Sequence, residues 1–340
     1  MTASERSSKT FVLETLGYDG LRECMRPVAS PRADQVLIRM RAASLNYRDL
    51  KILKGIYARQ PQLPIVPLSD GAGEVIEVGP EVRSAKVGDR VIPIYMEGWY
   101  DGPKTVVRDG WKSRGGDIDG TATEYALYRE RDVVLLPASM SFEEAACLPC
   151  AAVTAWHALV CVGGIKAGDT VLVMGSGGVS IFALQFAKIH GARVIATSSN
   201  DSKLRRLIAL GATDGINYRT MPNWEERVRD LTHGRGVDHV IEVGGTGTIR
   251  QSVRATRDGG NIEVVGDLTG AFGSSAIAER GIQITSIVVG SRAMTEDVVR
   301  TIDVHKEAPI IDSRFPFADL KLAVEHLESG RHFGKIVIVF

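Results

Sequence analysis

The sequence has few cysteines, no excess of charge of either sign and no apolar leader at its start. Its four cysteines, Cys24, Cys147, Cys150 and Cys161, are too few and too clustered for a disulfide framework. Lys and Arg total 41, and so do Asp and Glu. This balance leaves no net field to hold nucleic acid or an anionic membrane surface, so neither is expected as a partner. The polar opening MTASERSSKT lacks the apolar core of a secretory signal, which predicts a cytoplasmic protein.

A stretch from Ala145 to Ile165 carries no formal charge and is about as long as a membrane span. It includes Pro149, Thr154, His157 and the pair Gly163-Gly164. These residues favour a buried helix over a membrane span. The Cys147-Leu-Pro-Cys150 spacing inside it is also that of a redox pair or half a zinc site. No second pair accompanies it, so small buried hydrophobic side chains are the favoured interpretation.

The length and the strand pattern predict two domains. At 340 residues the chain exceeds the size at which one core usually stops growing. Up to about residue 150, β-branched runs at 36–41, 73–78 and 90–94 predict a β-rich barrel or sandwich. Between Met96 and Thr123 lies a segment rich in glycine and charge, with Trp99 and Trp111. A functional loop with exposed aromatics and a plain surface excursion are equally open for it.

From residue 151 to 290 the pattern alternates between β and α. Apolar strands are predicted at 170–174, 193–197, 237–243, 261–265 and 284–289, and helices at 179–190 and 201–210. Strands without polar alternation are typical of a parallel sheet covered on both faces, so this block is predicted to be a doubly wound α/β domain. After residue 291 come a helix at 318–329 and a final strand at 335–339, for which the first block is the expected host sheet.

A glycine-rich turn, Gly175-Ser176-Gly177-Gly178-Val179-Ser180, directly follows a predicted strand and opens a helix. This context raises the motif above a chance match and predicts a dinucleotide site. Gly175 can make the tight turn, and Gly177 and Gly178 let backbone N–H groups approach a pyrophosphate at the helix N-terminus. Ser180 stands where a small residue is needed for close packing of the helix on the strand. The alternative is an ordinary strand-to-helix turn.

The end of the next strand indicates which dinucleotide binds. NAD sites place an Asp or Glu there to bond the ribose 2′-hydroxyl, whereas this strand ends Thr197-Ser198-Ser199-Asn200. Ser198 and Ser199 can donate to phosphate oxygens, and Lys203 lies in the first turn of the following helix. NADP(H) is therefore favoured over NAD. The alternative is a plain helix cap with Lys203 in solvent.

Several segments together resemble the medium-chain dehydrogenase/reductase superfamily, especially its zinc-independent quinone oxidoreductase-like and enone reductase-like members, over nearly the whole chain. Besides the glycine turn they are Ser44–Leu50, Gly71–Val75, Val87–Val91, Leu148–Trp156, Gly211-Ala212, Ile216–Tyr218 and Arg331–Lys335. The resemblance implies a GroES-like substrate domain at residues 1–150, completed by 291–340, with a Rossmann NADP-binding domain inserted at 151–290. It also implies a catalytic cleft between the domains and a homodimer or higher homo-oligomer.

The resemblance also aligns four residues with the catalytic zinc site of alcohol dehydrogenases: Asn46, Ser69, Asp70 and Cys150. Only the cysteine is a strong zinc ligand, and zinc needs three protein ligands, so no metal is expected. Asn46 would instead face the nicotinamide ribose or the substrate oxygen. The other residues implied at the cofactor are Thr154 along the nicotinamide, Lys203 and Tyr218 at the adenosine 2′-phosphate, and Gly290, Ser291 and Phe333 to Lys335 closing over it.

Without a Lewis acid, an unactivated alcohol or ketone is a hard substrate, because alkoxide charge then needs other stabilisation. We therefore expect hydride transfer from NADPH to a quinone or an α,β-unsaturated carbonyl. Tyr47 and Tyr57 are candidates to hydrogen-bond the developing oxyanion, or to deliver the proton if water does not. Two alternatives stay open: an NADP-dependent alcohol or carbonyl dehydrogenase, and a non-catalytic NADPH-binding protein.

Overall fold

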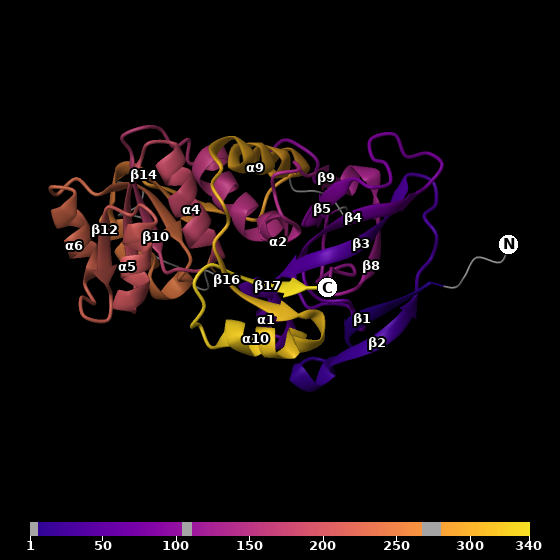
Figure 1. Ribbon diagram of the computed structural model, residues 1–340. Coiled ribbons are helices and arrows are strands. Elements are labelled where there is room, and N and C mark those ends of the chain that lie inside the picture. The colour runs from indigo at the N-terminus through magenta and orange to yellow at the C-terminus, as the bar shows by residue number, and fades with distance from the viewer. Residues whose placement is uncertain (1–5, 104–110, 267–279) are drawn as a thin grey trace. The chain divides into compact units, whose positions relative to one another are not determined.

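The computed structural model describes residues 6–103, 111–266 and 280–340. The chain divides into two compact units. Unit 1 is discontinuous and comprises residues 1–153 and 289–340, whereas unit 2 is the continuous segment 154–288. A β-rich unit interrupted by an α/β unit is the predicted fold class, which is confirmed (Figure 1).

Unit 1 is built on a seven-stranded, mostly antiparallel sheet. Its main path runs β16 (Ile311–Pro316), β17 (Lys335–Val339), β3 (Gln35–Ser44), β4 (Asp70–Val78), β5 (Arg90–Pro93) and β9 (Val133–Leu135), and β8 (Tyr125–Arg129) also pairs with β3. Two smaller pairs join β1 (Ser7–Leu13) to β2 (Leu21–Pro27) and β6 (Met96–Glu97) to β7 (Lys112–Ser113). β17, from the end of the chain, lies antiparallel to β3 with Val337 opposite Ser44, as expected for a strand hosted by the first block (Figure 1).

Helices cover this sheet and close its core. They are α1 (Tyr47–Leu53), α2 (Phe142–Ala146), α9 (Arg292–His305) and α10 (Leu320–Glu328). α10 contacts α1, although their first residues, Leu320 and Tyr47, lie 273 positions apart in the sequence. Leu50, Leu320 and Ile338 are among the side chains buried in their shared core. Each such burial contributes about 1.5–3 kcal/mol, so the C-terminal segment is an integral part of this unit.

Unit 2 is a six-stranded sheet in which every pair of neighbours is parallel. The order is β12 (Asp214–Asn217), β11 (Arg193–Ser198), β10 (Thr170–Met174), β13 (Val237–Glu242), β14 (Thr256–Val264) and β15 (Gln283–Ser286). Its helices are α4 (Gly178–Ile189), α5 (Asp201–Ala209), α6 (Trp224–Leu231) and α7 (Ile249–Ala255). The chain order reverses at β10, which is where doubly wound sheets bind ligands at the carboxyl ends of their strands.

The uncharged stretch from Ala145 to Ile165 is helical, as predicted, although its turns are uneven. It runs through the end of α2, a π-helical turn (Leu148–Ala152), α3 (Val153–Trp156) and a second π-helical turn (His157–Val162). Pro149 lies at the start of the first π turn, where a missing N–H is tolerated. In the described part of the chain, no helix combines the length and the apolar character needed to cross a bilayer.

The segment between Met96 and Thr123, for which exposed aromatic side chains were expected, holds one of its tryptophans in the interior. Trp99 is not exposed: it is 2% accessible and its ring stacks on Trp111, with centroids 4.7 Å apart. Its indole N–H donates to the carbonyl of Gly102. Trp99 is therefore covered in part by Trp111, which is itself partly accessible. Residues 104–110 of this segment lie outside the described residues.

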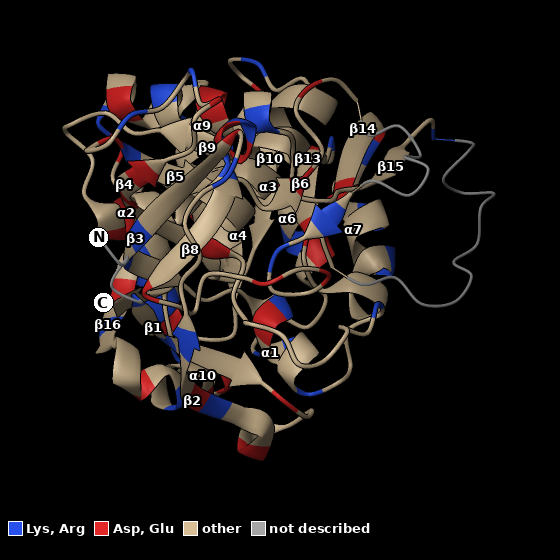
Figure 2. Ribbon diagram, turned by 90° about the vertical axis from the view of Figure 1, so that its right-hand side faces the viewer, with Lys and Arg blue, Asp and Glu red and all other residues tan. Residues whose placement is uncertain are grey.

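Basic and acidic residues are interspersed along the elements that Figure 2 shows. This distribution agrees with the equal totals of 41 in the sequence. Neighbouring charges of opposite sign pair locally, as Arg41 does with Glu74 and Arg193 with Asp214.

Candidate functional site

The glycine turn in unit 2 has the geometry that the sequence predicts. Gly175 has φ of +76°, which an L side chain rarely adopts, and its N–H donates to the carbonyl of Thr197 on β11. Gly177 precedes α4 as its N-cap. A Cβ atom added at Gly175 or Gly177 would meet no atom within 4 Å. Open space thus lies against the backbone at the N-terminus of a 12-residue helix, an arrangement suited to a pyrophosphate.

Ser180 explains how the helix lies so close to the strand. Its side chain is 2% exposed, and its hydroxyl donates to the carbonyl of Met174, the last residue of β10, at 2.6 Å. A small polar residue therefore both fits the packing and satisfies a strand-end carbonyl. The neighbouring Ser176 is also buried, whereas Val179 is partly accessible.

The end of β11 carries hydroxyl groups and no carboxylate at its tip. Asn200 caps α5, with its side-chain oxygen accepting from the N–H groups of Ser202 and Lys203. The helix cap that the sequence analysis gave as the alternative for this strand end is therefore present. The Ser198 hydroxyl accepts from the Asn200 N–H at 3.3 Å and keeps its own proton for donation. The nearest acid, Asp201, accepts instead from the Asn217 amide at 2.7 Å.

Tyr218 lies beside this strand end. Its backbone N–H donates to the Ser198 carbonyl, and its side chain is 42% exposed. The structure thus gathers Ser198, Ser199 and Tyr218 at the ends of two adjacent strands, with Lys203 in the first turn of α5. A ligand phosphate at this edge would meet hydroxyl donors and a lysine.

In unit 1, a closed ring of polar side chains forms around Asn46. The Lys335 ammonium donates to the Asn46 side-chain oxygen at 2.5 Å and to the Leu45 carbonyl at 2.8 Å, and lies 3.7 Å from an Asp70 oxygen. The Asn46 amide nitrogen donates to the Ser69 hydroxyl at 3.3 Å, and that hydroxyl donates to Asp70 at 2.8 Å. All four side chains are buried.

Local structure holds each member of this ring. Asn46 is the N-cap of α1, where its backbone N–H donates to Asp49. Asp70 begins β4, and its second oxygen accepts from the backbone N–H of Cys150 at 3.1 Å. Lys335 begins β17 after Gly334, whose φ is +92° and whose Cβ position would lie 2.2 Å from the Ile310 carbonyl oxygen. Only glycine fits there, so the turn that delivers Lys335 depends on it.

Burial governs the titration of the neighbouring groups. It raises the pKa of the Asp49 carboxyl to about 6, while the adjacent Arg48 guanidinium acts in the opposite direction. Burial, followed by the charge of Asp70, raises the pKa of the Cys150 thiol well above its usual range. The Cys150 thiol is therefore neutral at physiological pH. Of the two cysteines predicted to be small buried side chains, Cys147 is buried and Cys150 is partly accessible.

The two tyrosines predicted at the site differ in environment. Tyr47, the first residue of α1, is 66% exposed. Tyr57 is partly buried, and the Arg48 guanidinium and the Lys51 ammonium lie 5.5 and 5.8 Å from its ring centroid. Tyr57 also shares a hydrogen bond with Tyr95, whose pKa burial raises well above 10. Tyr57 therefore has fixed neighbours, and Tyr47 has few.

Arg48 and Tyr95 are site residues that the sequence reasoning did not single out. The Arg48 side chain is 8% exposed, with its guanidinium 5.0 Å from the Tyr95 ring and an Nη1 donating to Asp49 and to the Arg114 carbonyl. The run Asn46-Tyr-Arg-Asp49 contained the signal, because it places an arginine and an acid beside the asparagine. Tyr95 lies far along the chain and had no such signal.

The remaining predicted residues are buried. Thr154 in α3 is 4% exposed, and Ser291 caps α9 by accepting from the Met294 N–H. A Cβ on Gly290 would lie 2.6 Å from a Val153 methyl group. Phe333 is 1% exposed. Their roles at a cofactor stay predictions.

The residues aligned with a catalytic zinc lie beside a lysine. Asn46, Ser69 and Asp70 are bonded to one another, and Lys335 places a positive charge among them. A cation in the centre of the donor set opposes binding of a second cation. Among residues 6–103, 111–266 and 280–340, no three His, Cys, Asp or Glu side chains are grouped to hold a metal.

Comparisons with known proteins agree with this architecture. Residues 32–138 match the family model of the alcohol dehydrogenase GroES-like domain, and residues 178–303 match that of zinc-binding dehydrogenases. A zinc-type alcohol dehydrogenase-like protein of Schizosaccharomyces pombe is 43% identical over 89% of this chain and 90% of its own length. The 2-methylene-furan-3-one reductase of Solanum lycopersicum is 35% identical over 90% of this chain and 72% of its own.

A solved structure extends the likeness to the whole chain. It belongs to a Sinorhizobium meliloti 1021 protein assigned to the alcohol dehydrogenases, with a TM-score of 0.93 and 39% identity, and the match covers 100% of both chains. Sequence families, relatives and fold therefore converge. The chain belongs to the medium-chain dehydrogenase/reductase superfamily of oxidoreductases.

Proposed function

We propose that the chain is a zinc-independent, NADPH-dependent oxidoreductase that reduces quinones or α,β-unsaturated carbonyls. The observation that carries the proposal is the Lys335 ammonium among the residues aligned with the zinc site. The fixed positive charge of Lys335 opposes a metal ion that would act as a Lewis acid on the substrate. Substrates that accept a hydride without such activation are therefore favoured. The tomato relative, a 2-methylene-furan-3-one reductase, bears a name of this substrate class.

The residues present fit a nicotinamide dinucleotide. The open space against Gly175 and Gly177 at the start of α4 suits its pyrophosphate, and Ser198, Ser199 and Lys203 suit an adenosine 2′-phosphate. The residues at the strand tip itself, Ser198 and Ser199, carry no carboxylate, and the Asp201 carboxylate that follows accepts from the Asn217 amide. When bound, the cofactor supplies the hydride.

The chain's own groups then hold the acceptor and manage its charge. We propose that the Asn46 amide and the Tyr57 hydroxyl donate hydrogen bonds to the acceptor oxygen as negative charge develops there. A tyrosine hydroxyl is a weak acid at neutral pH but a good donor, so Tyr57 can stabilise the oxyanion whether or not it also delivers the proton.

The deciding experiment is a fluorescence titration of the protein with NADPH and with NADH, followed by turnover assays. We expect NADPH to bind more tightly, and Lys203→Ala to weaken NADPH binding about tenfold with little change for NADH. The Arg206→Ala variant, further along α5, is the matched control. Tighter binding of NADH would overturn the cofactor assignment.

The turnover assays compare two rates: the reduction of menadione or cyclohexenone by NADPH, and the oxidation of simple alcohols by NADP⁺. Reduction of the first pair with little oxidation of the second supports the proposal. The opposite result would favour the alcohol dehydrogenase suggested by the name of the fission yeast relative. Binding of NADPH with no turnover of either kind would favour a binding protein.

A further inference from the structure

The Asn46 amide has an orientation that the structure determines chemically. A lysine ammonium only donates hydrogen bonds, so the amide atom that it approaches at 2.5 Å must be the oxygen. The amide nitrogen therefore faces the Ser69 hydroxyl, which it contacts at 3.3 Å. Amide orientations are often uncertain in proteins, but here Lys335 removes the ambiguity.

One N–H of Asn46 remains for a ligand. An amide nitrogen carries two N–H donors, and among the described residues the Ser69 hydroxyl is the acceptor that this nitrogen has. The Ser69 hydroxyl passes its own proton toward Asp70. The hydrogen-bond direction thus runs from Asn46 through Ser69 to a buried carboxylate, and neither Ser69 nor Asp70 competes as a donor.

Lys335 also polarises the amide. A hydrogen bond from a charged donor to the amide oxygen withdraws electron density from the nitrogen, which makes its N–H groups better donors, and this cooperativity is strongest in a buried setting. Lys335 is 3% exposed and Asp70 is 0% exposed, so water does not screen the ring. The charge of Lys335 is balanced by Asp70 at 3.7 Å.

We propose that Lys335 is a positioning residue that fixes and polarises the Asn46 amide so that its remaining N–H donates to the acceptor oxygen of the substrate. This inference rests on the proposed function. It assigns Lys335 to the substrate-facing asparagine of unit 1 and not to the cofactor. Asp70 holds the lysine in place, and Ser69 holds the amide nitrogen of Asn46.

The first test observes the amide itself and needs no turnover. The chain has five asparagines, so protein labelled with ¹⁵N at asparagine alone gives five side-chain NH₂ signal pairs, and Asn46→Asp identifies the one from Asn46. We expect this pair to exchange slowly with solvent in the wild type and in Lys335→Arg. In Lys335→Met it should shift and exchange at least about tenfold faster, because the carbonyl loses its partner. Unchanged signals in Lys335→Met would overturn the inference.

The second test measures whether Lys335 acts through Asn46. With NADPH and cyclohexenone, Lys335→Met should lower kcat about 10- to 100-fold, leave the affinity for NADPH within about twofold, and be partly rescued by Lys335→Arg. In an Asn46→Ala background the same change should have little further effect. An equal loss in both backgrounds would show that Lys335 acts independently of Asn46 and would overturn the inference.

Removing the lysine leaves Asp70 buried without its partner, which can unfold the protein. The double variant Lys335→Met with Asp70→Asn removes both charges and is put through the same two measurements. If the wild type reduces no quinone or enone, the proposed function fails. The amide spectrum then still decides the inference about Lys335.

Discussion

At the scale of single residues, side chains of the same type perform different tasks because their surroundings differ. Tyr47 and Tyr57 lie ten positions apart, yet the first is 66% exposed and the second packs against Arg48, Lys51 and Tyr95. A hydroxyl group can stabilise an oxyanion only if it is held before the charge forms, because reorganisation during the reaction costs free energy. Tyr57 meets that condition in the structure.

This difference predicts unequal effects of removing the two hydroxyl groups. Tyr57→Phe should lower kcat for cyclohexenone reduction by about 100-fold, the usual cost of losing one oxyanion donor. Tyr47→Phe is the matched control and should leave kcat within about twofold. Steady-state kinetics with NADPH measure both. Full turnover by Tyr57→Phe would remove this residue from the mechanism.

At the scale of elements, two glycines of the same turn differ in whether the backbone itself requires glycine. Gly175 and Gly177 both face open space, but only Gly175 has a positive φ. Alanine at Gly177 is compatible with the backbone, whereas alanine at Gly175 is strained.

Gly177→Ala should therefore keep the free energy of unfolding or raise it by up to about 1 kcal/mol, while weakening NADPH binding at least about tenfold. Gly175→Ala should weaken binding and also destabilise the protein by about 1–2 kcal/mol. Thermal unfolding and cofactor titration of both variants provide the measurements. If Gly177→Ala binds NADPH normally, the pyrophosphate does not lie against this turn.

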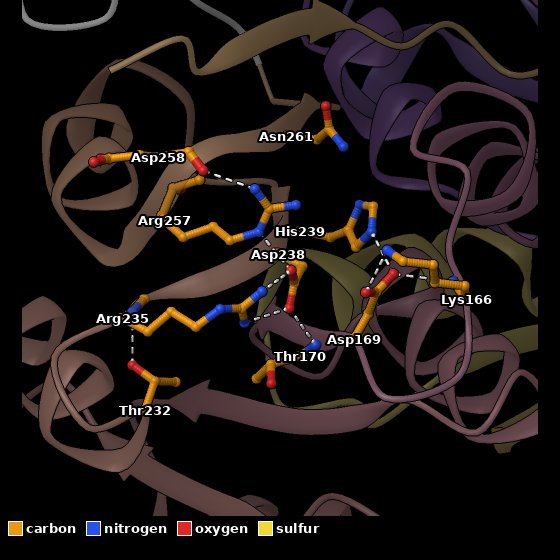
Figure 3. A network of polar contacts seen from close by, with 12 residues as sticks. Lys166, Asp169, Thr170, Thr232, Arg235, Asp238, His239, Arg257, Asp258 and Asn261 are labelled. Atoms are coloured by element: carbon orange, nitrogen blue, oxygen red, sulfur yellow. Dashed lines mark hydrogen bonds and ion pairs between the residues drawn. The ribbon is translucent and has the colours of Figure 1, made fainter. Parts of the chain in front are cut away.

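A second element-scale feature is a buried ionic network that ties together the strands of unit 2. His239 on β13 contacts Glu263 on β14 at 3.1 Å. Its other ring nitrogen lies 3.3 Å from Asp169, which precedes β10 (Figure 3). Lys166 pairs with Asp169 at 2.7 Å. Burial by itself would lower the pKa of His239, but Glu263 and then Asp169 raise it above 6.5.

A raised histidine pKa predicts the sign of a pH effect on stability. Protonated His239 stabilises the folded state fully below its unfolded pKa of about 6.5, and this contribution is lost as the pH rises through the higher folded value. His239→Gln should therefore reduce the melting temperature more at pH 6 than at pH 9.

Melting curves across this pH range test the prediction, with Glu263→Gln as a companion variant. Glu263→Gln removes the stronger of the two partners and should shrink the pH dependence, since the pKa of His239 then falls toward its ordinary value. An equal loss of stability by His239→Gln at both pH values would contradict the assignment.

At the scale of the whole molecule, the sequence predicts best those elements whose structure depends on residues adjacent in the chain. β10 was predicted to the residue, because an unbroken apolar run between Gly168-Asp169 and Gly175 permits few alternatives. The sequence also predicts the end of the strand at Ser198 and the end of the helix at Gly191. Short or amphipathic elements such as β12 and α9 were not identified, since four residues carry little periodicity and a mixed surface helix resembles a loop.

The site was predictable only in part, for a related reason. Asn46 could be named from a motif, but the contact of Lys335 with Asn46 joins residues 289 positions apart. The resemblance to the superfamily implies that Lys335 lies at the cofactor. The pairing of β17 with β3 determines where this lysine points, and that pairing is a tertiary fact.

The late position of β17 also sets an order of events during synthesis. Residues 154–288 form a continuous unit that can fold as soon as they leave the ribosome, whereas the sheet of unit 1 waits for its strand at residues 335–339. Until then residues 42–44 of β3 lack their partner strand, and the buried Asp70 lacks its lysine. A nascent chain therefore cannot assemble the polar ring around Asn46 early, and the chemistry of unit 1 becomes available only when the last strand is in place.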